Sequence, residues 1–153
     1  MAVEVGEQID RIVQLRSRQC VDQLDEVRAV RVLAQHVSQS EIAKQLHISQ
    51  SAVSQRLKRA AAVAEAPAGF SGASPYEIAQ RYAAGLISRE RVIDELARWD
   101  YEPRHRTDGV DWLTPDDPGR TFEAVGAALD DGLLGDEVYD AILDAKDALS
   151  HTR

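Results

Sequence analysis

The chain has 153 residues, of which 44% are hydrophobic, 29% are charged and 5% are aromatic, with a net charge of −8. This composition fits one globular domain or two small ones. No stretch approaches the roughly 18 consecutive apolar residues of a membrane-spanning helix, and the acidic start lacks the apolar run of a signal peptide. The single cysteine, Cys20, rules out a disulfide within the chain. We therefore expect a reduced, cytoplasmic protein that has no membrane partner.

The sequence predicts an all-α fold. Ala, Leu and Arg are abundant, and alternating runs of β-branched residues are missing. We expect an N-terminal helix and helix-turn-helix domain over residues 1–63, a linker over 64–73, and an acidic helical-hairpin domain of about four helices over 74–153. The linker, AEAPAGFSGA, is rich in Gly, Pro and small residues.

Residues 3–37 carry a helical pattern almost throughout, with a possible break at residues 17–19. Apolar side chains recur at steps of three or four: Val5, Ile9, Ile12, Val13, Cys20, Leu24, Val27, Val30, Leu33 and Val37. Residues 21–37 would form the first helix of a three-helix unit, and we expect Cys20 to be a small core residue. The stripe that precedes them packs either on the same chain or on a second copy of it.

The next stretch has the layout of a helix-turn-helix. Ser40 can cap a short helix that ends at Leu46, His47 begins a tight turn, and Ser49 can cap a second helix, about Gln50–Val63. Small Ala43 suits the place where the two helices cross. The expected apolar contacts come from Ile42, Leu46, Ile48, Val53 and Leu57.

One face of the second helix is polar, and its chemistry favours DNA. Its members are Gln50, Ser51, Ser54, Gln55 and Lys58. Glutamine can pair at two atoms with an adenine edge, and serine can reach a base or a phosphate. We expect Gln50, Ser51, Ser54 and Gln55 to read bases. The expected phosphate contacts are Lys58, Arg59, Arg56, Lys44 and Gln39. The alternative is a solvated face on an ordinary helical hairpin.

The stretch resembles the tri-helical helix-turn-helix of bacterial and phage regulators of the Cro/repressor type. The matching residues are Glu41-Ile42-Ala43, Leu46-His47-Ile48 and the run Ser49-Gln50-Ser51-Ala52-Val53-Ser54-Gln55. The resemblance implies that the same four Gln and Ser side chains face the bases. His47 departs from the family, which usually has Gly at this turn position. That position often needs a positive φ, which His tolerates less well than Gly.

Charge is unevenly distributed along the chain. Residues 1–66 hold nine Lys or Arg and eight Asp or Glu, whereas residues 67–153 hold nine and eighteen. The second part would be repelled by DNA, but it could bind a basic protein partner. A DNA-reading part joined to an acidic part is also the layout of an autoregulating antitoxin.

The acidic part predicts two helical hairpins. Ser74 and Pro75 start a helix that Gly85 ends, and Ser88 caps the next helix, 89–99. Residues 100–119 are loop-like, and we expect Trp112 and Leu113 to attach this loop to the core. Two further helices are predicted, from 120 or 121 to 131 and over 137–149. The two hairpins align at a period of 47 residues, either as an internal repeat or because helix ends share the same residues.

The first of these hairpins echoes the helix-turn-helix. Glu77-Ile78-Ala79 and Ile87-Ser88, followed by Val92 and Leu96, repeat its apolar pattern with three more residues in the turn. The second helix of this hairpin would, however, expose Glu90, Asp94 and Glu95. Carboxylates facing phosphates make a second DNA-reading helix a poor interpretation.

No catalytic constellation stands out, so we expect no enzyme activity, no cofactor and no metal. His105 lies near Asp108, Asp111, Asp116 and Asp117, but a solvated acidic loop explains these residues as well as a cation site does. A small-molecule pocket around Trp99, Tyr101 and Trp112 is the alternative to their being core residues. The sequence therefore predicts a dimeric transcriptional regulator that binds double-stranded DNA. The alternative is an antitoxin-like or other regulator whose residues 74–153 bind a basic protein.

Overall fold

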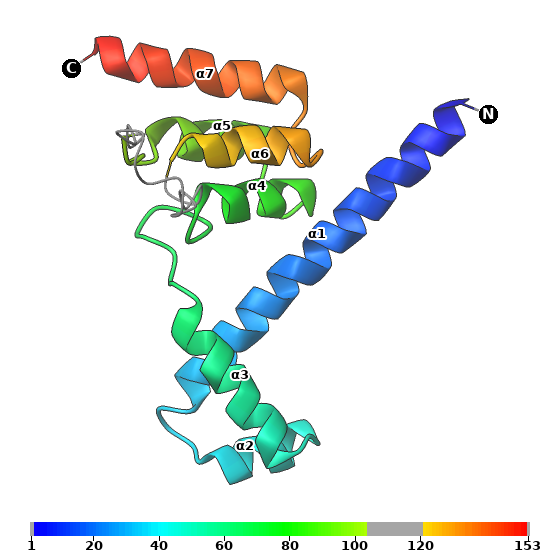
Figure 1. Ribbon diagram of the computed structural model, residues 1–153, viewed down its shortest axis with the longest axis vertical. Coiled ribbons are helices and arrows are strands. Elements are labelled where there is room, and N and C mark those ends of the chain that lie inside the picture. The colour runs from blue at the N-terminus through cyan, green and yellow to red at the C-terminus, as the bar shows by residue number, and fades with distance from the viewer. Residues whose placement is uncertain (1, 104–120, 153) are drawn as a thin grey trace, which may run out of the picture. The chain divides into compact units, whose positions relative to one another are not determined.

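The protein is all-helical, as predicted, in a computed structural model that describes residues 2–103 and 121–152 (Figure 1). The described residues form seven α-helices and no β-strand. The helices are α1 (Ala2–Leu33), α2 (Gln39–Leu46), α3 (Gln50–Ala62), α4 (Pro75–Ala83), α5 (Arg89–Arg98), α6 (Glu123–Asp130) and α7 (Asp136–His151). None of the helices described here is both long and apolar enough to cross a membrane.

The chain divides into two compact units. One unit consists of Gln19–Glu65, and the other of residues 1–18 together with 66–153. The first unit contains the C-terminal half of α1 with α2 and α3, around a small core of Val30, Ile42, Ala43 and Val53. Val37, Ile48 and Leu57 pack against this core, as their spacing predicts, but Leu46 does not. Leu46 is 46% exposed, so its predicted place among the buried contacts is wrong.

Helix α1 runs without interruption through residues 17–19, so the possible break there does not occur. This stretch contains neither Pro nor Gly, the residues that most often end or kink a helix, and Ser17 is buried inside the continuous helix. Cys20 is exposed, which corrects its expected place in the core. The apolar spacing does not tell which of two neighbouring residues faces the core, and in the structure this residue is Val21.

The short helix α2 begins earlier than predicted. Its N-cap is Ser38, whose side chain accepts a hydrogen bond from the backbone N–H of Glu41, so the predicted cap at Ser40 is wrong. From the sequence alone, either serine could cap the helix. Ser38 is the cap because it lies directly before the first helical residue. Ser49 caps α3 as predicted, by accepting a hydrogen bond from the N–H of Ala52.

The second unit packs two helical hairpins, α4–α5 and α6–α7, around one core (Figure 1). Helix α5 contacts α7, α4 contacts α6, and each hairpin is closed by contacts between its own helices. The fully buried residues at the centre are Ile78, Ala79, Val92, Leu96, Val125, Ala128 and Ile142. The four helices of this unit agree with the predicted ones to within about three residues at each end.

Three helices end with the same backbone turn. His47 (φ 57°), Gly85 (φ 77°) and Gly132 (φ 76°) each adopt a positive φ just after α2, α4 and α6. In each case the N–H of the following residue donates to a carbonyl five positions back, as between Ile48 and Ala43 (3.0 Å) or Leu86 and Arg81 (2.9 Å). This is the hydrogen-bond pattern of a Schellman cap. His47 therefore adopts the backbone conformation that glycine favours.

The residues just before α4 pack against α5 of the second unit. Phe70 stacks edge-on against Trp99 at 4.8 Å, and the guanidinium of Arg98 lies 4.1 Å from the centre of the Phe70 ring. The hydroxyl of Ser71 donates to the buried carboxylate of Glu95 at 2.6 Å. The last part of the predicted linker is thus fixed to α5.

Two of the three aromatic residues that suggested a pocket, Trp99 and Tyr101, line a cavity as well as packing on the core. Trp99 and Tyr101 pack against the buried cluster, and the Tyr101 hydroxyl donates to the carbonyl of Leu96 at 2.5 Å. Burial raises the pKa of the Tyr101 phenol well above its usual range. Trp112 and Leu113 lie outside the described residues.

Candidate nucleic-acid interface

Helix α3 has one buried side and one exposed polar side. Val53 and Ala60 are almost fully buried, at 0% and 1% exposure, and they hold α3 against its unit. The exposed side carries Gln50, Ser51, Gln55, Lys58 and Arg59, and Ser54 is half-buried beside them. The structure therefore brings the four predicted base-reading residues together on one face, with two cations farther along the same helix.

The start of α3 is ordered by serine hydroxyls. Ser49 and Ser51 share a hydrogen bond of 3.0 Å, and the Ser40 hydroxyl lies 3.4 Å from the side-chain oxygen of Gln50. Ser40 sits in the first turn of α2, so the N-terminal ends of α2 and α3 meet at the exposed face. The short side chains at this end leave the α3 backbone open to a close approach by a ligand.

The predicted phosphate-binding residues fall into two groups. Lys44, in the last turn of α2, and Lys58 and Arg59 of α3 are exposed. Arg56 differs, because its Nε donates to Glu26 of α1 at 2.8 Å and its side chain is 30% exposed. Gln39, the first residue of α2, is half-buried. Arg56 thus has a structural ion pair within the unit in addition to any contact it makes with a ligand.

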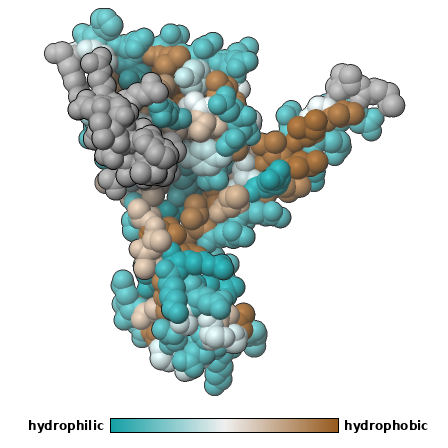
Figure 2. Space-filling model, in the orientation of Figure 1, coloured by the Kyte–Doolittle hydropathy of each residue, from teal (hydrophilic) through white to brown (hydrophobic). Residues whose placement is uncertain are grey.

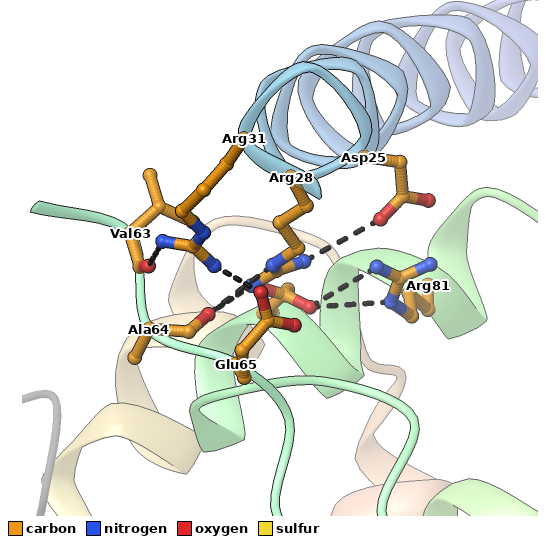
Figure 3. A network of polar contacts seen from close by, with 8 residues as sticks. Asp25, Arg28, Arg31, Val63, Ala64, Glu65 and Arg81 are labelled. Atoms are coloured by element: carbon orange, nitrogen blue, oxygen red, sulfur yellow. Dashed lines mark hydrogen bonds and ion pairs between the residues drawn. The ribbon is translucent and has the colours of Figure 1, made fainter. Parts of the chain in front are cut away.

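Two arginines of α1 hold the end of α3, a feature that the sequence analysis missed (Figure 3). Arg31 Nη1 donates to the backbone carbonyls of Ala60 at 2.5 Å and Val63 at 2.7 Å, and Arg31 also pairs with Glu65. Arg28 donates to the carbonyl of Ala64 at 2.8 Å. The Ala60 carbonyl lies in the last turn of α3 and also accepts from the N–H of Val63, and the other two carbonyls belong to the residues that directly follow the helix.

No local pattern in the sequence could have revealed these contacts. The donors and acceptors are separated by 29 to 36 residues, so only the folded unit brings them together. Their effect is to fix the C-terminal end of α3 to α1. The core fixes its middle and Ser49 its start, so the exposed face is carried by a helix that is held along its whole length.

Metal-ligating side chains are not clustered in the part of the chain that the structure describes. No group of three or more His, Cys, Asp or Glu side chains within residues 2–103 and 121–152 is arranged to hold a metal ion. The predicted cluster of His105 with Asp108, Asp111, Asp116 and Asp117 lies outside the described residues.

Comparison with known protein families identifies the region that contains this face. Residues 14–62 match the family model of sigma-70, region 4. Region 4 is a helix-turn-helix DNA-binding region, so the chain contains a helix-turn-helix of the DNA-binding kind. The match supports the predicted motif but not the Cro/repressor type in particular.

The match covers less than half of the chain and ends with α3. Searches of curated proteins and of solved structures gave no significant match. The helix-turn-helix therefore supports a DNA-binding regulatory role for the protein, and the match does not extend to α4–α7.

Proposed function

We propose that the protein is a sequence-specific transcriptional regulator that inserts α3 into the major groove of double-stranded DNA. The observation that carries the proposal is the exposed polar face of α3 within a region that matches a DNA-binding family. Gln50, Ser51, Ser54 and Gln55 read base edges, because amide and hydroxyl groups match the donors and acceptors that the major groove presents.

The cations near this face hold the DNA backbone. Lys58 and Arg59 lie on the later turns of α3 and Lys44 ends α2, and all three side chains are exposed. Gln39 and Arg56 complete the proposed phosphate contacts, with Arg56 shared between Glu26 and the DNA. Phosphate contacts set the position and orientation of a reading helix, while the base contacts carry the specificity.

The proposed regulator acts as a homodimer. Helix-turn-helix proteins commonly bind paired half-sites about one turn of DNA apart, which a symmetric dimer matches. The acidic residues 67–153 are repelled by phosphates, so we assign DNA binding to residues 19–65. We propose that the protein acts by binding rather than by catalysis.

A second candidate rests on the acidic charge of the second part of the chain. Residues 67–153 hold twice as many Asp and Glu as Lys and Arg, a surface suited to a basic protein partner. In this alternative, which includes an antitoxin-like regulator, residues 74–153 bind the partner and the helix-turn-helix serves mainly as a scaffold.

Selection of bound DNA from a random pool by the full chain tests the proposal. We expect a recurring sequence, whose affinity falls steeply as salt rises because cations on the protein release counterions from the phosphates. Recovery of no sequence preference, with binding insensitive to salt, would favour the protein-binding alternative.

A further inference from the structure

We propose that the N-terminal half of α1 pairs with the same segment of a second copy of the chain, in antiparallel orientation. This inference deepens the homodimer of the proposed function by naming its surface and its orientation. It uses residues 4–18, which lie outside the DNA-reading face.

The surface is an apolar stripe along α1, visible as a brown band in Figure 2. Val5, Ile9, Ile12 and Leu15 are 60%, 55%, 53% and 52% exposed. Their steps of four, three and three residues put them on one side of the helix. Single exposed apolar residues are ordinary on a protein surface, whereas four in helical register form the stripe by which helices pack together.

The charges around the stripe identify its occupant. Glu4 lies near its start, and Arg16 lies near its end. A parallel pair would bring like charges together at both ends. An antiparallel pair brings the acidic start of each copy to the basic end of the other, so the segment is complementary in charge to itself.

The spacing of the stripe fits the same orientation. With Ile9 of one copy opposite Ile12 of the other, Val5 lies opposite Arg16 and Glu4 lies next to that contact. The isoleucines of both copies then fall at the centre of the pair, and the opposite charges of Glu4 and Arg16 lie at its two ends. Antiparallel packing also brings opposite helix dipoles together.

This pairing leads the two chains away from the paired segment in opposite directions. Each copy continues from its own Arg18 into its own helix-turn-helix. A symmetric dimer therefore carries two reading helices, one from each copy, as two half-sites on DNA require.

Sedimentation of the full chain tests whether the stripe is the surface. We expect the double variant Ile9→Gln, Ile12→Gln to raise the dimer dissociation constant by at least about tenfold, because two apolar contacts are lost from each copy. The control is Glu7→Gln, Arg11→Gln, which places two glutamines on other sides of the same helix turns and should leave the dimer nearly unchanged.

All four substituted residues are exposed in the single chain, so these variants should keep their helical content in circular dichroism. A wild-type chain that is monomeric at every concentration would overturn the dimer. A dimer that resists the double variant would overturn the stripe as its surface. Neither result changes the binding of one chain to a single half-site, so failure of the reading helix is measured separately.

A charge swap tests the orientation. Glu4→Arg and Arg16→Glu should each weaken the dimer, and the two together should restore it, because the reversed charges meet again across an antiparallel pair. Residues 4 and 16 are about three helical turns apart within one chain, so an intramolecular ion pair cannot explain such a rescue. A double variant as weak as the two single changes combined would overturn the antiparallel arrangement.

Discussion

The hairpins α2–α3 and α4–α5 share one internal design and differ in what they present outward. Ile42 and Ile78 are both fully buried on the first helix, and Val53 and Val92 are both fully buried on the second. A serine caps the second helix of each hairpin, Ser49 in one and Ser88 in the other. The apolar residues and caps therefore specify a helical hairpin and nothing about a ligand.

The outward faces separate the two hairpins. Helix α3 exposes Gln50, Gln55 and two cations. On α5, by contrast, charged side chains form ion pairs with one another. On α5, Arg98 donates to Asp94 at 2.8 Å, and Arg91 donates to the buried Glu95 at 3.2 Å. Carboxylates that satisfy arginines on the same helix leave α5 poorly suited to phosphates. The comparison shows that the DNA-binding interpretation depends on the surface of α3 and not on the motif's interior.

The largest expected effect comes from the interior that the two hairpins share. Replacing Ile42 or Ile78 with Ala should lower the free energy of unfolding of its own unit by about 2–5 kcal/mol, because both side chains are fully buried. Denaturant titration measures each effect. An effect below about 1 kcal/mol at either site would show that the two interiors are not equivalent.

A smaller loss of stability is expected when the bonds that hold the end of α3, the second helix of the first hairpin, are removed. Arg31→Met removes the bonds to the carbonyls of Ala60 and Val63, and we expect it to destabilise the first unit by about 1.5–3 kcal/mol. DNA affinity should fall as well, measured by fluorescence anisotropy, because the end of α3 loses its attachment to α1. Unchanged stability would mean that water replaces these bonds without loss.

Removing either of the two serine helix caps should lower stability by the same amount. Ser49→Ala and Ser88→Ala each remove a side-chain oxygen that accepts a backbone hydrogen bond, at Ala52 and at Arg91, and each should cost about 1 kcal/mol. Thermal unfolding of the two variants provides the measurement. Only the change at Ser49 should also reduce DNA binding, and equal losses of binding would contradict the assignment to α3.

The smallest changes in stability are expected at the turns formed by His47 and Gly85, and they should have opposite signs. His47→Gly should stabilise the first unit by up to about 1 kcal/mol, because a residue with a Cβ is strained at φ 57°. Gly85→Ala should destabilise the second unit by about 1 kcal/mol for the same reason at φ 77°. A destabilising His47→Gly change would mean that the imidazole makes contacts worth more than the backbone strain.

Local chemistry made much of this molecule predictable from its sequence. The span of α3, the cap at Ser49 and the end of α4 at Gly85 all follow from residues within a few positions of each other. The polar face of α3 was predictable for the same reason, because helical spacing alone decides which residues share a side.

Features that depend on distant parts of the chain were not predictable. Cys20 and Val21 are adjacent, and only the fold decides that the valine is buried and the cysteine exposed. The bonds from Arg28 and Arg31 to the end of α3 span about thirty residues of sequence. The cap of α2 is Ser38 rather than Ser40 because the path of the loop after α1 sets where α2 begins.

Binding of the selected DNA sequence by two matched double variants tests the central claim most directly. Gln50→Ala with Gln55→Ala removes the proposed reading groups from α3, and Glu90→Gln with Asp94→Asn changes exposed residues on α5. We predict that the α3 variant loses about 1–3 kcal/mol at each base that it contacts and keeps its non-specific affinity. The α5 variant should bind the selected sequence as the wild type does. An α3 variant that binds and discriminates as well as the wild type would contradict the account.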